Sequence, residues 1–77
     1  MSVKVLYFGS LRERMGKSEI MCDPPADLTV AEVWTWLDAD TPRPDDILCS
    51  INQEYVKPDA IVRNGDELAF FPKVTGG

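Results

Sequence analysis

Two apolar segments near opposite ends of the chain impose the strongest constraint on its fold. Residues 3–9, VKVLYFG, carry β-branched and aromatic side chains at both alternating sets of positions, which is typical of a strand buried on both faces. Residues 67–71, ELAFF, form a second apolar strand, and Pro72 is expected to end it. A chain of 77 residues folds as one small domain, so both strands belong to the same core.

The clearest element between these strands is an amphipathic helix that begins after Thr29. Glu32 follows three residues later, and this spacing predicts a capping box in which each side chain bonds the other residue's backbone N–H. The helix presents one apolar face, made by Val30, Val33, Trp34 and Leu37. Trp36 falls off that face, so we expect it to be partly exposed or packed under a loop.

Weaker signals complete the order of elements. Ser10 and Glu13 have the spacing of a second capping box, and Gly16 suits a helix end, so a short helix is expected after the first strand. Residues 17–23 are expected to form a strand, and residues 47–56 a strand, a tight turn and another strand.

One helix across one face of a mixed sheet buries such a pattern economically. We therefore expect an α+β fold of the β-grasp (ubiquitin-like) type, with one main helix and a short extra helix after the first strand. This arrangement places the first and last strands side by side and parallel at the centre of the sheet. We expect a single domain over residues 1–71 and a flexible Gly-Gly tail over residues 72–77.

The composition excludes several classes of function. The chain has no histidine, which excludes Ser-His-Asp and Cys-His triads and imidazole metal sites. Its net charge of −5 and scattered Lys and Arg residues argue against nucleic-acid binding and suit a basic partner protein. Cys22 and Cys49 form no zinc pattern and are expected to be buried reduced thiols, with a disulfide or a reactive thiol as alternatives. No signal peptide or membrane span is evident, so we expect a cytoplasmic protein without metal or bound cofactor.

Aromatic residues at the strand ends suggest a surface site. Side chains alternate along a strand, so only one of Tyr7 and Phe8, and one of Phe70 and Phe71, can face the helix. The other of each pair, together with Tyr55, is expected on the open face of the sheet. Such a cluster is either a protein interface or is covered by loops, and the spacing alone does not decide between them.

The segment PKVTGG follows the last strand directly. Glycines have no Cβ, so Gly76 and Gly77 could pass through a narrow channel and approach the reactive groups of another protein. A terminal carboxylate is inert until it is activated, for instance as an acyl-adenylate. The alternative is a frayed end without a role.

The stretches VKVLYFGSLRERMG and INQEYV…NGDELAFFPKVTGG resemble the MoaD family, the small subunits of molybdopterin synthase. They cover about half of the chain, and residues 17–50 match only in the order strand, loop and helix. Lys73 departs from the family pattern, which commonly has a second proline there.

This resemblance implies a sulfur carrier with a β-grasp fold. An ATP-dependent, ubiquitin-activating-like adenylyltransferase would adenylate the Gly77 carboxylate, which would then become a thiocarboxylate. The tail would enter the active site of the large synthase subunit, with Gly76 giving access, and pass sulfur to a cyclic pyranopterin precursor. The residues implied in partner binding are Phe8, Tyr55, Phe71, Pro72, Lys73, Val74 and Thr75.

The resemblance also implies that the chain is a non-catalytic subunit of a heterotetrameric sulfurtransferase, inactive alone, and that only the activating enzyme uses ATP. Three alternatives remain at this point. The chain could carry sulfur for thiamin thiazole synthesis, serve as a ubiquitin-like modifier joined to lysines, or be a plain binding module with an idle tail.

Overall fold

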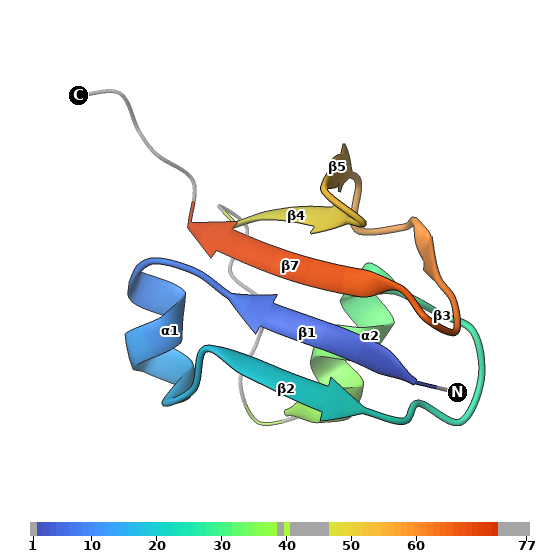
Figure 1. The fold of residues 1–77 in the computed structure, drawn as a ribbon, viewed down its shortest axis with the longest axis horizontal. Coiled ribbons are helices and arrows are strands. Elements are labelled where there is room, and N and C mark those ends of the chain that lie inside the picture. The colour runs from blue at the N-terminus through green and yellow to red at the C-terminus, as the bar shows by residue number, and fades with distance from the viewer. Residues whose placement is uncertain (1, 39, 41–46, 73–77) are drawn as a thin grey trace.

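The computed structural model describes residues 2–38, 40 and 47–72. Its elements are β1 (Val3–Tyr7), α1 (Ser10–Met15), β2 (Glu19–Cys22), β3 (Leu28–Thr29), α2 (Val30–Leu37), β4 (Ile47–Ile51), β5 (Glu54–Val56), β6 (Ile61–Val62) and β7 (Glu67–Pro72). A five-stranded sheet has the order β2-β1-β7-β4-β5, and β3 and β6 form a separate two-stranded sheet. Figure 1 shows α2 crossing behind the larger sheet, as the β-grasp prediction requires.

The first and last strands are parallel neighbours at the centre of the sheet, which confirms the main prediction from the sequence. Val5 lies opposite Leu68, and Tyr7 lies opposite Phe70. Strand β2 flanks β1 on one side and β4 flanks β7 on the other, both in antiparallel pairing. Both apolar strands therefore have a hydrogen-bonded neighbour on each side.

The core lies between the central strands and α2. The Tyr7 and Phe70 rings stack with their centroids 6.0 Å apart, and Trp34 of α2 meets Phe70 edge-on at 4.9 Å. Such pairs contribute about 0.5–1.5 kcal/mol each beyond the burial of their area. Val30 and Val33 complete the buried face of α2, whereas Trp36 is 43% exposed. The predicted apolar face of the helix is confirmed. Trp36 is partly exposed, which is the first of the two alternatives predicted for it.

The predicted capping box at the start of α2 is present. The Glu32 N–H donates to Thr29 Oγ1 at 3.1 Å, and the Thr29 N–H donates to Glu32 Oε1 at 2.8 Å. Two backbone donors at the helix start, which have no partner within the helix, are thereby satisfied.

The second predicted capping box, at α1, is wrong. Gly9 is the N-cap with φ 58° and ψ −137°, Ser10 is already helical, and no side chain caps the helix. The backbone turns at Gly9 itself, and the N–H groups of Leu11 and Arg12 donate to the carbonyls of Phe8 and Gly9. The predicted end at Gly16 is confirmed by its left-handed φ of 74°.

Three further features differ from the sequence prediction or lie beyond it. The pairing of β3 with β6 was not predicted, because two residues per strand show no periodicity. Strand β7 includes Pro72, which pairs with Ile47, whereas we expected it to end the strand. A proline is tolerated at a strand end, where its missing N–H interrupts no ladder. Apart from Pro72, the predicted tail 72–77 lies outside the described residues.

Both cysteines are free thiols. Cys49 is buried, and its Sγ donates to the Val56 carbonyl at 3.2 Å. Cys22 is half-buried, and its Sγ donates to the Val3 carbonyl at 3.4 Å. Burial raises the pKa of the Cys22 thiol, and the Asp23 carboxylate raises it further. A raised pKa lowers the thiolate fraction at neutral pH and makes Cys22 a poor nucleophile.

Within the described residues, no helix is both long enough and apolar enough to cross a membrane.

The buried hydroxyl of Tyr7 predicts a loss of stability in alkali. Burial raises the pKa of Tyr7, and the nearby Cys22 and Asp38 add to this effect. Because the folded state holds the proton more tightly, this stability is complete below the usual tyrosine pKa of about 10 and is lost as the pH rises above it. We expect Tyr7→Phe to flatten the decline in unfolding free energy above about pH 10, measured by urea titration.

Tyr55→Phe controls for the loss of a hydroxyl at a position that is 74% exposed. A Tyr7→Phe profile parallel to that of the wild type would contradict the prediction.

Candidate functional site

The predicted aromatic cluster exists at the end of the central strands. Phe8 follows β1 and Phe71 lies in β7, and their rings stack with centroids 5.1 Å apart and an interplanar angle of 18°. Tyr7 and Phe70 face α2, so alternation along the strands turns Phe8 and Phe71 to the opposite, open face. The parallel pairing of β1 with β7 therefore brings these two rings together, as the sequence predicted.

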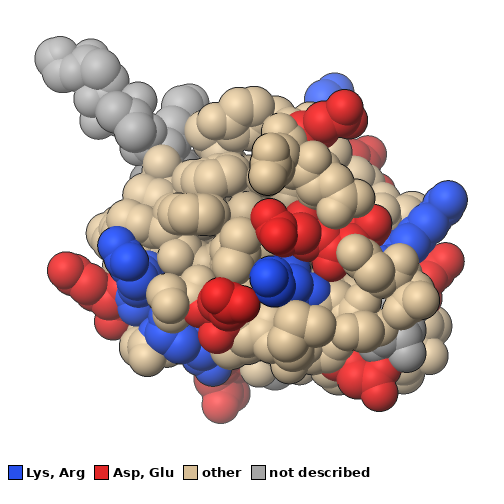
Figure 2. Space-filling model, viewed as in Figure 1, with Lys and Arg blue, Asp and Glu red and all other residues tan. Residues whose placement is uncertain are grey.

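The two strands on the other side of β7 extend this cluster. Tyr55 of β5 meets Phe71 edge-on with centroids 5.8 Å apart, and Leu48 of β4 lies opposite Phe71 in the sheet. Phe8 is 43% exposed, Leu48 40% and Tyr55 74%, so no described loop covers the cluster. We call the set Leu6, Phe8, Leu48, Tyr55 and Phe71 the open-face patch. Figure 2 views this face of the sheet, and uncharged residues cover its upper part, over β4 and β7.

The open-face patch surrounds a hollow of about 330 Å³. Its lining is Leu6, Phe8, Ser50, Gln53, Tyr55, Glu67, Ala69 and Phe71. Ala69 and Ser50 are each only 5% exposed although they face away from α2. Neither residue was predicted from the sequence. A small residue at an outward position of a central strand is the signal that could have found them.

Gly9 and Pro72 form a close contact beside the patch. A Cβ added to Gly9 would lie 2.8 Å from Pro72 Cγ and 3.2 Å from Pro72 Cδ, so only glycine leaves room for the ring. Pro72 is the last residue before the predicted tail, and the turn at Gly9 therefore borders the point where the tail leaves the sheet. This role of Gly9 was not predicted from the sequence either.

Of the predicted site residues, Phe8, Tyr55, Phe71 and Pro72 come together at one end of the sheet. The remaining ones, Lys73, Val74, Thr75, Gly76 and Gly77, lie outside the described residues. No group of three or more acidic or cysteine side chains within the described residues could hold a metal ion.

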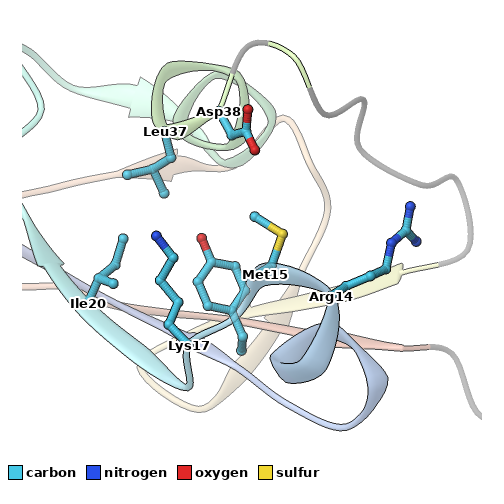
Figure 3. A pocket seen from close by; sticks show the side chains of 7 residues that line it. Arg14, Met15, Lys17, Ile20, Leu37 and Asp38 are labelled. Carbon is cyan, nitrogen blue, oxygen red and sulfur yellow. The ribbon is translucent and has the colours of Figure 1, made fainter.

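A second cavity, of about 350 Å³, lies between α1, β2 and the end of α2, and Tyr7 contributes to its lining. Figure 3 shows Lys17 extending its ammonium between Ile20 and Met15, whereas Arg14 points away. The raised pKa keeps Tyr7 protonated at neutral pH, so it offers the cavity no base. None of the residues that line this cavity belongs to the predicted site, and we do not assign the cavity to the functional site.

Comparison with known proteins gives a consistent result. The chain matches the ThiS family over residues 5–77. The molybdopterin synthase sulfur carrier subunit of Escherichia coli (strain K12) is 36% identical over 83 residues, covering 97% of this chain and 99% of that protein. SAMP1 from Haloferax volcanii has a TM-score of 0.79 at 28% identity and covers 100% of both chains.

A structure of the complex of subunits 1 and 2 of molybdopterin-converting factor from Helicobacter pylori 26695 contains a chain with the same fold. That chain matches with a TM-score of 0.69 at 17% identity over 100% of both chains. At this identity the likeness concerns the fold alone.

The contact between Gly9 and Pro72 predicts a position-specific cost of substitution. We expect Gly9→Val to lose about 1–3 kcal/mol more unfolding free energy than Gly16→Val, measured in urea. Both glycines have positive φ, but no atom outside the local chain lies within 4 Å of a Cβ placed on Gly16. Replacing Pro72 by Ala in the Gly9→Val protein should recover part of the loss. Equal losses at Gly9 and Gly16 would show that the ring contact has no effect.

Proposed function

Because the chain belongs to the ThiS family, we propose that it is the sulfur carrier subunit of a molybdopterin synthase. The resemblance to the small subunits of this enzyme is confirmed, since a relative of that name matches almost the whole chain. The observation that carries the proposal is the position of the open-face patch. Its Phe8 and Phe71 lie where β7 leads directly into the tail that ends in Gly76-Gly77.

The proposed partner is the large synthase subunit, which docks on the open-face patch. Aromatic side chains such as Phe8, Tyr55 and Phe71 often carry most of the binding energy of an interface, because they bury large areas with few rotatable bonds. The net charge of −5 suits a partner whose substrate-binding face is basic. Six residues follow Phe71, and an extended segment of that length reaches about 20 Å into the partner.

The proposed chemistry belongs to the Gly77 carboxylate. A carboxylate oxygen attacks the α-phosphate of ATP in an activating adenylyltransferase, and pyrophosphate leaves. Sulfide then attacks the acyl carbon, AMP leaves, and the product is a thiocarboxylate. In the synthase the thiocarboxylate sulfur attacks a carbon of the pyranopterin precursor, and an oxygen substituent of that carbon leaves. Water then cleaves the acyl–sulfur bond, so the sulfur stays on the precursor and the terminus returns to a carboxylate. The tail's glycines allow close approach, and the enclosing subunit keeps water from the sulfur.

This mechanism needs no acid or base from the carrier. The chain has no histidine, and the pKa values of Tyr7 and Cys22 are both shifted away from ionisation at neutral pH. We therefore assign the catalytic groups to the large subunit and to the activating enzyme. In this scheme the carrier is a non-catalytic subunit.

The likeness to SAMP1, whose solved structures are named as a small archaeal modifier protein, favours a second candidate function. A ubiquitin-like modifier would use the same activated Gly77 but would transfer its acyl group to a lysine amine. A carrier for thiamin thiazole synthesis would pass the sulfur to a different acceptor. All three functions share the activation step, and the acceptor distinguishes them.

Activation of the terminus is the first prediction of the proposed function. We expect incubation with ATP, a sulfide source and the activating enzyme to replace one oxygen of Gly77 by sulfur. The measurement is the intact mass, followed by isolation of the C-terminal peptide and alkylation of its thiocarboxylate. The alkylation step is necessary because oxidation of a methionine gives the same nominal mass change.

Deletion of Gly76 and Gly77 should abolish this modification without changing the urea unfolding curve. An unmodified wild-type terminus, under conditions that convert a known carrier, would exclude sulfur transfer. Ladders of conjugates in cells would instead support the modifier function.

Docking through the open-face patch is the second prediction. We expect Phe8→Ala to weaken binding to the large subunit by about 1–2 kcal/mol, roughly a factor of ten, as calorimetry would measure. Trp36→Ala is a matched control, because both side chains are 43% exposed but Trp36 lies on α2. Equal losses for the two variants would contradict docking on the open face.

A further inference from the structure

One cross-strand row of side chains shapes the hollow in the open-face patch. Leu6, Ala69, Ser50 and Tyr55 lie opposite one another across β1, β7, β4 and β5. The two small residues occupy the middle of this row, between the larger Leu6 and Tyr55. Ala69 and Ser50 are each 5% exposed and form the floor, while their larger neighbours rise on both sides.

Contacts among the aromatic rings hold one wall of the hollow in place. Phe71 stacks on Phe8 and meets Tyr55 edge-on, so each ring restricts the others. A cavity whose walls are already ordered costs little conformational entropy to fill. Its volume of about 330 Å³ provides room for one large side chain.

The hollow is also acidic at one side. Glu67 and Gln53 line it, and Glu67 lies two residues before Ala69 on β7. Lys4 is the cross-strand neighbour of Glu67, but its Nζ lies 3.6 Å from Glu19 Oε2 instead. Within the described residues, this pairing leaves the Glu67 carboxylate without a basic partner.

We propose that this hollow receives an apolar side chain of the large synthase subunit, with a neighbouring Lys or Arg of that subunit pairing with Glu67. The inference rests on the proposed function, because the subunit that takes up the tail must lie against the end of β7. Strand β7 carries both the floor of the hollow and the start of the tail, so the partner has to cover Ala69 and Phe71 together. Preformed apolar pockets that are ringed by aromatic side chains are typical positions for an anchoring side chain.

The decisive experiment fills the hollow from its floor. Ala69→Leu adds apolar surface to the patch, so a flat hydrophobic contact would bind equally well or more tightly. An occupied hollow gives the opposite result, since the added side chain competes with the partner's. We expect Ala69→Leu to raise the Kd for the large subunit at least tenfold, as calorimetry would measure.

Ala31→Leu is the matched control, because it adds the same side chain to α2 on the other side of the sheet. It should leave the Kd within twofold of the wild type. Ser50→Val is a second variant that fills the floor from β4 with a residue that favours strands. The urea unfolding curve of each variant establishes that it is folded.

The basic neighbour is tested separately with Glu67→Gln. We expect a severalfold slower association with the large subunit, and a weaker dependence of that rate on salt, in stopped-flow measurements. Glu13→Gln on α1 removes the same charge at an exposed position outside the hollow and should change the rate less. An unchanged rate for Glu67→Gln would overturn the pairing.

The outcomes separate this inference from the proposed function. If folded Ala69→Leu and Ser50→Val proteins bind as tightly as the wild type while Phe8→Ala binds weakly, the hollow is unoccupied and the inference is overturned, although docking on the patch stands. If the wild-type chain does not bind the large subunit, both fail. Loss of binding in both floor variants, with Ala31→Leu unaffected, supports the occupied hollow.

Discussion

The parallel pairing of β1 with β7 determines which aromatic side chains are buried in the core and which lie on the open face of the sheet. The register sets Tyr7 beside Phe70, and the next residue along each strand then has to face the other side of the sheet. One pair of rings packs against Trp34 in the core, while Phe8 and Phe71 stack on the open face. A slip of one residue in either strand would exchange core and surface aromatics, so the same pairing specifies both the core and the open-face patch.

Local patterns in the sequence predicted several structural features that depend on residues close together in the chain. Alternation predicted that adjacent aromatic residues of one strand lie on opposite faces of the sheet, and the spacing of Thr29 and Glu32 predicted the start of α2. The same spacing failed at Ser10, because the turn into α1 lies at Gly9. Its positive φ goes with a close contact to Pro72, which is distant in sequence. The capping pattern carries no information about such a contact.

The hollow lay beyond sequence prediction for the same reason. Ser50 and Ala69 are unremarkable in their own strands, and their roles appear only when the register places them side by side. The patch rings were found because aromatic residues are conspicuous, whereas the small residues that give the patch its depth were not. A surface predicted from large side chains alone therefore lacks the hollow that the proposed anchoring side chain would occupy.

Under the proposed function, the folded domain and the C-terminal tail have different roles, and the side chains of the domain explain why. Within the described residues, the groups that could react near neutral pH are few, and burial raises the pKa of both Tyr7 and Cys22. Under the proposed function, the only reactive group is the carboxylate of Gly77, which gains its reactivity from another enzyme.

The folded domain then contributes position rather than catalysis. Docking on the open-face patch holds the end of β7 against the partner, and a tail of a few residues is long enough to reach the partner's active site but too short to search far from it. Binding at the patch therefore raises the effective concentration of the terminus where the sulfur is needed.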